Sequence, residues 1–433
     1  MTCSIFRVLP AVLIITILSA NPLLSRDFNQ PYSILGTGSY QSNQLATHLS
    51  QGSLNAVGWS DRSFSPVNPA TYGGLEYTSL KTGVNAQLME TTYRGQVSEG
   101  ENISLSYLAL GFPVSTDNNW GMVAGFTPYS QSSFNFTLPT GDENQINRLS
   151  GEGHLNKFYV GSSFAIVEGL TIGANAGFLF GNFSSNDALE FTGGDGFENV
   201  RESRETDLSG FVLDGGLQYR YENDDDQFLQ LGASAELPLE LSGDGRRFSH
   251  NFRVDRRGGD NGRSITITDT VSFEEGIDQR VKPPPRFNFG LQGGADDSWS
   301  VGGQLSFHLW SDFESFQLSS PITEELTDEY EVSLGGSFTP DIDDRQNFFN
   351  RVTYNLGIKY ANTKIKEDGH ELERIAVSGG FDLPLPGTRS EIHLGVEAGR
   401  NLDQEESRIN EDYIKFLAAF SLTERWFRER RID

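Results

Sequence analysis

The strongest constraint on this chain is an alternation of apolar and polar residues that recurs along most of its length. Between Arg351 and Tyr360 every even-numbered residue is Val, Tyr, Leu or Ile, and every odd-numbered residue is Gly or polar. Successive side chains of a β-strand point to opposite faces of a sheet, so the pattern predicts a strand with one apolar and one polar face. It recurs near residues 211–221, 299–309 and 392–398. We therefore expect an all-β protein.

About fourteen segments alternate in this way, and most exceed the roughly 9 to 11 residues that a tilted strand needs to cross a bilayer. Their connections also alternate, being short after segments two, four, six, eight and twelve and long after segments three, five, seven and nine. The segments lie at 76–90, 102–114, 119–136, 154–166, 169–183, 207–222, 227–241, 285–295, 298–310, 329–340, 350–365, 370–383, 388–401 and 411–423.

An even strand number with short turns on one side and long loops on the other is typical of bacterial outer-membrane barrels. The alternative is a large soluble β-sandwich or propeller, but sandwich strands are usually only about 5 to 6 residues long. The pattern predicts a transmembrane antiparallel β-barrel of about 14 strands, placed in the outer membrane as a multi-pass, porin-like protein.

Composition narrows the possible functions. The chain has 433 residues with 33 Lys and Arg against 59 Asp and Glu, a net charge of −26. Nucleic acid is excluded as an electrostatic partner, because neutralising phosphates needs a basic face. The single cysteine is Cys3, so a mature chain without its N-terminus has no disulfide or thiolate chemistry.

The N-terminus has the form of an export signal. Arg7 precedes an apolar run from Val8 to Ala20, and this run is too short for the roughly 20 residues of a helical membrane span. Cleavage after Ala20 or Ser25 is compatible with the small residues there, and we take residues 1–25 as the signal peptide. No later window holds 18 consecutive apolar residues.

Residues 26–75 lack the strand alternation and contain several glycines. We expect this segment to fold compactly at the periplasmic end as a plug in the barrel mouth. The predicted organisation is a signal peptide at 1–25, a plug or hatch at 26–75, a barrel at 76–427 and a periplasmic tail at 428–433.

The plug and several other motifs resemble the long-chain fatty-acid transporter (FadL-like) superfamily of outer-membrane proteins, in a Bacteroidetes-type branch. The first of these motifs is Asn68, Pro69 and Ala70, directly before the first strand. The others are Gln30–Ser33, Pro284–Phe287, Trp310–Phe313, Leu383–Leu385 and Ser421–Phe427.

This resemblance implies a fourteen-stranded barrel closed by an N-terminal hatch, with Asn68, Pro69 and Ala70 as its gating residues. It also implies passive uptake of hydrophobic molecules such as long-chain fatty acids, although some FadL-like proteins serve secretion instead. Asn followed by Pro is also a turn former, which is the structural alternative for the motif. The glycines Gly121, Gly125, Gly173 and Gly177 allow either a kinked strand with a lateral opening or ordinary barrel curvature.

The sequence gives no catalytic constellation. The six histidines include no pair at a spacing of three or four, so we expect no metal site, no cofactor and no enzymatic activity. His308 and His393 fall on the polar parity of their strands beside Gln304 and Glu397, where lining of the lumen is the favoured interpretation over a catalytic pair. The candidate lumen-lining residues are Tyr159, Leu179, Gln304, His308, Trp310, His393 and Leu417.

The segment from Leu241 to Lys282 departs from the general acidity. Between Arg246 and Arg286 there are nine basic and six acidic residues. We expect a long outer loop, with a hairpin of its own at 264–271, that contacts lipopolysaccharide phosphates or caps the lumen. A variable surface loop is the alternative.

Two functional classes follow. The first is a channel in which a hydrophobic molecule enters from outside, rests above the hatch and leaves sideways into the membrane, since crossing a water-filled pore is unfavourable for an apolar solute. The second is a non-transporting barrel that anchors a secretion or motility assembly and has a protein partner. An apolar pocket of several hundred Å³ above the plug would favour the channel, whereas a packed lumen would suit the anchor.

Overall fold

The computed structural model describes residues 29–34, 37–41, 44–93, 95–140, 142–191, 198–258, 262–315, 325–367, 370–402 and 409–425. The predicted signal peptide and the predicted periplasmic tail lie outside these residues. Within them, no helix has the length and apolar character needed to cross a bilayer.

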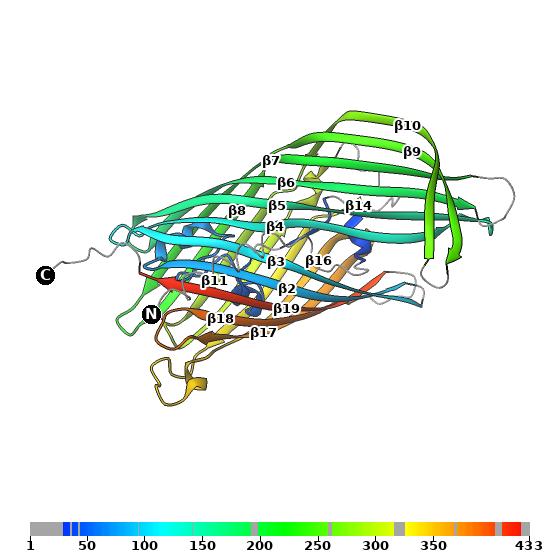
Figure 1. Ribbon diagram of the computed structural model, residues 1–433. Coiled ribbons are helices and arrows are strands. Elements are labelled where there is room, and N and C mark those ends of the chain that lie inside the picture. Colours follow the sequence, from blue (N-terminus) through cyan, green and yellow to red (C-terminus); the bar gives the residue numbers. More distant parts are fainter. Residues whose placement is uncertain are drawn as a thin grey trace, which may run out of the picture.

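Fourteen antiparallel wall strands close into a barrel, as the alternation predicts. Neighbours in the chain are neighbours in the wall, and the pairing of the last strand with the first closes the ring (Figure 1). Ten wall strands are single continuous elements: β2 (Thr78–Tyr93), β3 (Gln96–Ser115), β4 (Trp120–Pro139), β5 (Gln145–Val167), β6 (Leu170–Phe191), β7 (Asn199–Glu222), β16 (Thr353–Glu367), β17 (His370–Pro384), β18 (Glu391–Asn401) and β19 (Asn410–Glu424).

The remaining wall strands include pairs of consecutive elements. Strand β7 pairs with β8 through residues 212–222 and with β9 through residues 199–209, so β8 and β9 follow each other along one wall position. Strands β11 and β10 do the same, separated by Pro283–Pro285, whose missing N–H groups cannot continue a ladder. The elements are β8 (Gln227–Pro238), β9 (Leu241–Gly258), β10 (Gly262–Lys282), β11 (Arg286–Ala295), β12 (Trp299–His308), η3 (Trp310–Asp312), β13 (Glu314–Ser315), β14 (Glu325–Leu326), β15 (Glu329–Phe338) and η4 (Phe348–Arg351).

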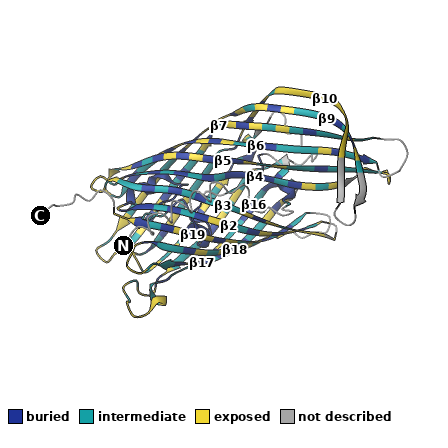
Figure 2. Ribbon diagram, viewed as in Figure 1, coloured by how far each residue is buried: buried dark blue, intermediate teal, exposed yellow. Residues whose placement is uncertain are grey.

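The apolar parity of the strands faces outward. On β16 Leu356 is 68% exposed while its neighbour Asn355 is 5% exposed, and on β12 Val301 is 59% exposed while Gln304 is 3% exposed. Figure 2 shows the same alternation of exposed and buried residues along the wall. Large apolar side chains on the outside of a closed barrel are suited to lipid, and the polar parity is left for the interior.

Each expected strand overlaps an observed one, but many observed strands run further on the long-loop side. The segment expected at 154–166 is β5 (Gln145–Val167), and the one expected at 207–222 is β7 (Asn199–Glu222). Strand pairing continues there through polar residues, where hydropathy carries no signal. The expectation of an outer loop at 241–282 with a small hairpin at 264–271 is corrected: the segment forms one long hairpin of β9 and β10, and residues 264–271 lie within β10. Trp310, expected at the end of a strand, lies in η3.

The N-terminal segment (residues 29–77 here) lies inside the ring of strands (Figure 1). It contains η1 (Pro31–Ile34), β1 (Ser39–Tyr40), α2 (Ala46–Ser50) and η2 (Pro69–Gly74). β1 pairs with β4, η2 contacts β3 to β7, and α2 contacts β16 to β19. The segment thus reaches opposite walls of the barrel.

Candidate functional site

The Asn-Pro-Ala motif begins η2 and fixes it to the wall. The Asn68 side chain accepts a hydrogen bond from the Ala70 N–H at 3.1 Å, and its Nδ2 donates to the Ala56 carbonyl at 2.6 Å and the Leu217 carbonyl of β7 at 3.2 Å. Pro69 occupies the first position of η2, where its missing N–H costs nothing. Asn68 and Ala70 are 0% exposed. The motif is therefore a fully bonded N-cap that also contacts the barrel.

Glycines in three strands of one side of the wall allow η2 to approach this closely. A Cβ on Gly173 of β6 would lie 2.5 Å from the Pro69 carbonyl carbon and oxygen, and one on Gly121 of β4 or Gly216 of β7 would overlap Tyr72 or Asn68. These strands leave space for the backbone of η2 where any side chain would fill it. At Gly121 and Gly173 the structure thus shows close approach of the η2 backbone, which differs from both the lateral opening and the ordinary curvature expected from the sequence.

The opposite wall receives α2 and the turn after it in a similar way. The Gln51 side chain donates from Nε2 to Asn355 Oδ1 at 2.8 Å, and the Gly52 N–H donates to Ser378 Oγ at 3.1 Å. A Cβ on Gly335 or Gly357 would overlap the backbone of Gln51 and Gly52. The turn after α2 and the start of η2 thus both lie against glycine positions of the wall.

Gln304 and Gln230 hold the middle of the segment. Gln304 Oε1 accepts from the backbone N–H groups of Asn55 and Ala56, each at 2.8 Å, while its Nε2 donates to Asn55 Oδ1 at 3.0 Å. Gln230 Oε1 accepts from the N–H of Trp59 at 3.2 Å. Both glutamines are buried. Gln304, a predicted lumen-lining residue, therefore holds the N-terminal segment through hydrogen bonds.

His393 lies between an aspartate and a serine in a hydrogen-bond chain, the same order of residue types as in a catalytic triad. Its Nδ1 lies 2.8 Å from Asp382 Oδ1 and its Nε2 lies 2.9 Å from Ser421 Oγ. However, Ser421 is 3% exposed, and its Oγ also accepts a bond from Lys81 Nζ at 3.1 Å. Thr47 Oγ1 of α2 lies 3.1 Å from the same Nδ1. The chain therefore links α2 to the wall and leaves the hydroxyl inaccessible to a substrate.

His48, on the buried face of α2, is a histidine without a hydrogen-bond partner at Nδ1 among the described residues. Burial, and then the charge of Lys81, lowers the pKa of His48 to about 4. It is therefore neutral at physiological pH.

The predicted apolar lumen residues lie in three separate clusters. Tyr159 packs with Phe64 and Tyr72 of the N-terminal segment, and Leu417 packs with Leu45 and Leu49 of the same segment. Leu179 lies in a third cluster, with Leu155 and Val212 among its buried members. All three residues are 5% exposed or less. They fill the interior and leave no open apolar surface at these positions.

His308 and Trp310 belong to a cluster of rings and cations near η3. The two rings lie 4.7 Å apart, and the Lys364 ammonium lies 4.0 Å from the Trp310 ring centroid. His308 also contacts the Tyr40 ring, over which the Arg286 guanidinium stacks at 2.9 Å. Cations over aromatic faces are favourable, more so where water is excluded.

This cluster borders a lumen cavity of about 260 Å³ whose lining is strongly charged. Two of the ion pairs in it are Lys359–Glu397 and Arg374–Glu411, each at 2.8 Å. The ionisable side chains that line it, apart from His308 and the tyrosines, are Arg286, Glu329, Glu331, Lys359, Lys364, Arg374, Glu397, Glu411 and Lys415. The cavity beside the N-terminal segment thus has many charged lining residues among apolar ones, unlike the apolar pocket that a channel was expected to need.

A second ionic group was not anticipated from the sequence. Lys157 Nζ lies 2.8 Å from Asp214 Oδ1 and 2.7 Å from Glu236 Oε2, and Arg286 pairs with the same glutamate at 2.5 Å. Lys157 shares the parity of Tyr159, so the alternation placed it inside, but only the register of β5, β7 and β8 brings the carboxylates to it.

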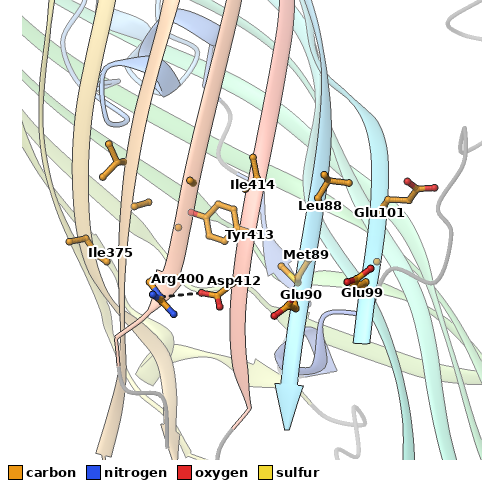
Figure 3. Close-up of a pocket in the computed structure, with 15 residues that line it drawn as sticks. Leu88, Met89, Glu90, Glu99, Glu101, Ile375, Arg400, Asp412, Tyr413 and Ile414 are labelled. Atoms are coloured by element: carbon orange, nitrogen blue, oxygen red, sulfur yellow. Dashed lines mark ion pairs between the residues drawn. The ribbon is translucent and has the colours of Figure 1, made fainter. Parts of the chain in front are cut away.

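Two further hollows adjoin the barrel. One of about 690 Å³ lies at the end that carries the short turns and is lined by residues such as Trp59, Arg62 and Asp297. The other, of about 880 Å³, lies in the wall formed by β2, β3, β17, β18 and β19. In Figure 3 the Arg400–Asp412 ion pair, with Nε and Oδ1 3.2 Å apart, lies near Glu90 and Glu99. The hollow also has apolar lining residues such as Leu88 and Ile414.

The described residues contain no group of three or more His, Cys, Asp or Glu side chains placed to hold a metal ion.

Comparison with known proteins places the chain in a family. A family model described as BamG matches residues 6–433. The chain belongs to the BamG family. No curated protein matches it. Among solved structures, the toluene transporter TodX of P. putida is 16% identical, with a TM-score of 0.56 over 87% of this chain and 100% of that one. The toluene transporter TbuX of Ralstonia pickettii is 12% identical, with a TM-score of 0.55 over 88% and 98%.

These neighbours share the barrel fold with this BamG-family protein. Both are named as transporters of a hydrophobic compound. The barrel and its neighbours place the protein in the outer membrane.

Proposed function

We propose that the protein is a non-transporting barrel subunit that anchors an outer-membrane assembly. The observation that carries this proposal is the occupied lumen: the N-terminal segment bonds to opposite walls through Asn68, Gln51 and Gln304. A ligand that passes through the lumen would have to break these hydrogen bonds to displace the plug.

The chemistry of the remaining lumen space supports the same role. An apolar ligand in the 260 Å³ cavity would displace water from charged side chains without replacing its hydrogen bonds, which is unfavourable. Membership of the BamG family is also compatible with an assembly subunit. The working surfaces of such an anchor are the outer parts of the barrel.

The test is native mass spectrometry of the protein extracted from its own outer membrane in a mild detergent. We expect one or more proteins bound at fixed stoichiometry and no small lipophile. A stoichiometric hydrophobic molecule, with no bound protein, would overturn the proposal.

A second candidate is passive uptake of hydrophobic molecules, with long-chain fatty acids as one substrate class. The specific observation in its favour is that the lumen cavity and the wall hollow share three lining residues, Met89, Ala376 and Tyr413. Gly100 and Gly399 line the hollow beside them, and a ligand that leaves sideways would do so here. The fold shared with TodX and TbuX is compatible with this role.

Uptake of a labelled hydrophobic compound by cells tests the second candidate. If this is the route, Ala376→Trp should obstruct it and lower uptake, whereas Ala233→Trp, at a wall position away from the hollow, should not. Equal uptake by cells lacking the protein would remove the candidate.

The boundaries also remain part of the proposal: a signal peptide at 1–25, a plug at 26–75, a barrel at 76–427 and a periplasmic tail at 428–433. So do a Bacteroidetes-type origin, the absence of enzymatic activity and contact with lipopolysaccharide. For the last of these, Arg246 and Arg253 of β9 already pair with Glu205 and Glu198, with N–O distances of 3.8 and 3.2 Å. Phosphate would have to compete with these carboxylates.

A further inference from the structure

Strand β10 has one paired edge and one nearly free edge. Along the first it pairs with β9 from Gly262 to Val281. Along the second, within the part of the chain that the structure describes, it is paired only at Val281 and Lys282, opposite Ser315 and Glu314 of β13. Among the described residues, most of this 21-residue strand therefore has no partner strand for its second row of backbone N–H and C=O groups.

The faces of this strand are also uncovered. Every residue from Thr266 to Gly276 is exposed, whereas buried and exposed residues alternate along β8. Ile267, Val271 and Phe273 are 59%, 61% and 58% exposed. A wall strand normally buries one parity against the interior, so β10 is exposed to contact from a neighbour on both faces and along one edge.

The composition of the edge favours pairing. The stretch from Ile265 to Phe273 is rich in β-branched residues and has neither Pro nor Lys, the residues that commonly blunt an edge strand. Register shifts at Ile267/Asp269, Thr270/Ser272 and Glu274/Ile277 increase its twist. A twisted edge disfavours indiscriminate association, so it calls for a partner of matching shape.

Charge indicates which partner fits. Asp269, Glu274 and Glu275 lie along the exposed stretch, which contains no basic residue. On the paired edge Glu274 lies opposite Arg247 of β9, and beyond the stretch Arg280 already pairs with Asp278 at 3.3 Å. A second copy of the chain would bring the same acidic edge and repel it. A strand with basic side chains would be attracted.

We propose that the free edge of β10 binds an extended, basic segment of a protein partner by adding it as a further strand. This inference rests on the proposed role in an outer-membrane assembly and assigns the surface at which the assembly is joined. Backbone hydrogen bonds would supply affinity, and the acidic side chains would select the partner.

The test places a photo-crosslinking residue singly at Thr266, Thr268 and Thr270 in cells that make the full chain. We expect all three to link to one partner protein, at sites that shift by about two residues for each two-residue step along β10, as adjacent strands require. The linked peptide should carry several Lys or Arg residues. A crosslinker at Val301, which lies on a strand paired along both edges, is the matched control.

A doubly substituted variant distinguishes strand pairing from simple proximity. Thr268 and Val271 lie at register shifts and have no ladder partner on β9, so T268P and V271P leave the β9 pairing intact while obstructing the free edge. In the doubly substituted chain, crosslinking from Thr266 and Thr270 should fall severalfold.

Unchanged crosslinking in that variant would overturn the proposal, as would crosslinks that map to a second copy, to residues 316–324 of the same chain, or to nothing beyond the Val301 level. If a protein still co-purifies in these cases, the assembly role stands and only the β10 surface is wrong. If none co-purifies, the proposed function fails as well.

Discussion

At the scale of single residues, the interior is organised around buried polar side chains that bind the backbone of the N-terminal segment. Gln304 satisfies two N–H groups and Asn68 joins two stretches of chain. Leaving such buried groups unpaired costs about 1 to 3 kcal/mol each. These side chains therefore determine whether the segment stays in place.

Replacing Gln304 should loosen the segment without unfolding the barrel. In Gln304→Leu the N–H groups of Asn55 and Ala56 lose their acceptor, so we expect docking of the segment to weaken by about 2 kcal/mol or more. Limited proteolysis would show faster cleavage between residues 44 and 77. Gln292→Leu, on the neighbouring strand β11, is the control, because among the described residues that side chain has a hydrogen bond to Ser300 and none to the N-terminal segment. Equal protection in the two variants would contradict the assigned role.

His48 should make docking of the segment depend on pH. Its pKa is lowered from 6.5 to about 4 in the docked state, so the undocked state binds the additional proton. Docking should be fully stable above about pH 6.5, weaken as pH falls towards 4, and level off below it. The shift of 6.5 − 4 = 2.5 corresponds to about 3 kcal/mol at most.

A fluorophore on an introduced cysteine, Ser63→Cys, would report release of the segment in urea at each pH. In His48→Gln the dependence between pH 6.5 and 4 should disappear, since no proton is then taken up. If docking of the segment still depends on pH in this variant, another titratable group causes the dependence.

At the scale of elements, the fit between η2 and three glycine-bearing strands is the main determinant of where the N-terminal segment lies. Gly216→Ala should displace η2, because the new Cβ would overlap the Asn68 side chain. Its neighbour Gly215 has open space around the same position, so Gly215→Ala is a closely matched control. We expect protease sensitivity of residues 55–75 in the first variant only. Hydrogen exchange along β7 should be unchanged in both variants. This result would distinguish displacement of η2 from disruption of the strand itself.

The elements also show what the sequence could and could not predict. All fourteen wall strands follow from the period-two pattern, because lipid outside and polar groups inside impose it. The outer ends were missed because strands such as β5 and β7 continue to pair through residues of similar polarity on both faces. Trp310 was placed on a strand because it continues the alternation, whereas the chain turns at Leu309 into η3.

Prediction of the site was limited for a different reason. Parity identified Gln304, His308 and His393 as inward-facing, and the structure places them there. Their partners, however, are up to 346 residues away in sequence, as for His393 and Thr47. A single sequence does not specify which inward residues meet across the lumen. The wall residues that bind the N-terminal segment and the ion pairs of Lys157 could therefore not be predicted.

At the scale of the whole molecule, the structure combines a channel-like fold with an occupied lumen. A fourteen-stranded barrel encloses enough space for solute to pass, yet here α2 and η2 extend between its walls and ion pairs line much of the cavity that remains. The same barrel can thus serve as a closed anchor or as a conduit, depending on how firmly the N-terminal segment is held.

Electrical conductance measures this closure directly. The intact protein in a planar bilayer should show little ion current, because the segment is fixed to β7, β12 and β16 by buried hydrogen bonds. Deletion of residues 44–75 should produce a steady current through the emptied, polar lumen. Since that deletion removes much packing, the double variant Gln304→Leu with Gly216→Ala provides a second route, and intermittent current is expected from it. The pair Gln292→Leu with Gly215→Ala should stay closed. A large, constant current through the intact protein would show that the segment does not seal the barrel, and the anchor would then have to be an open pore.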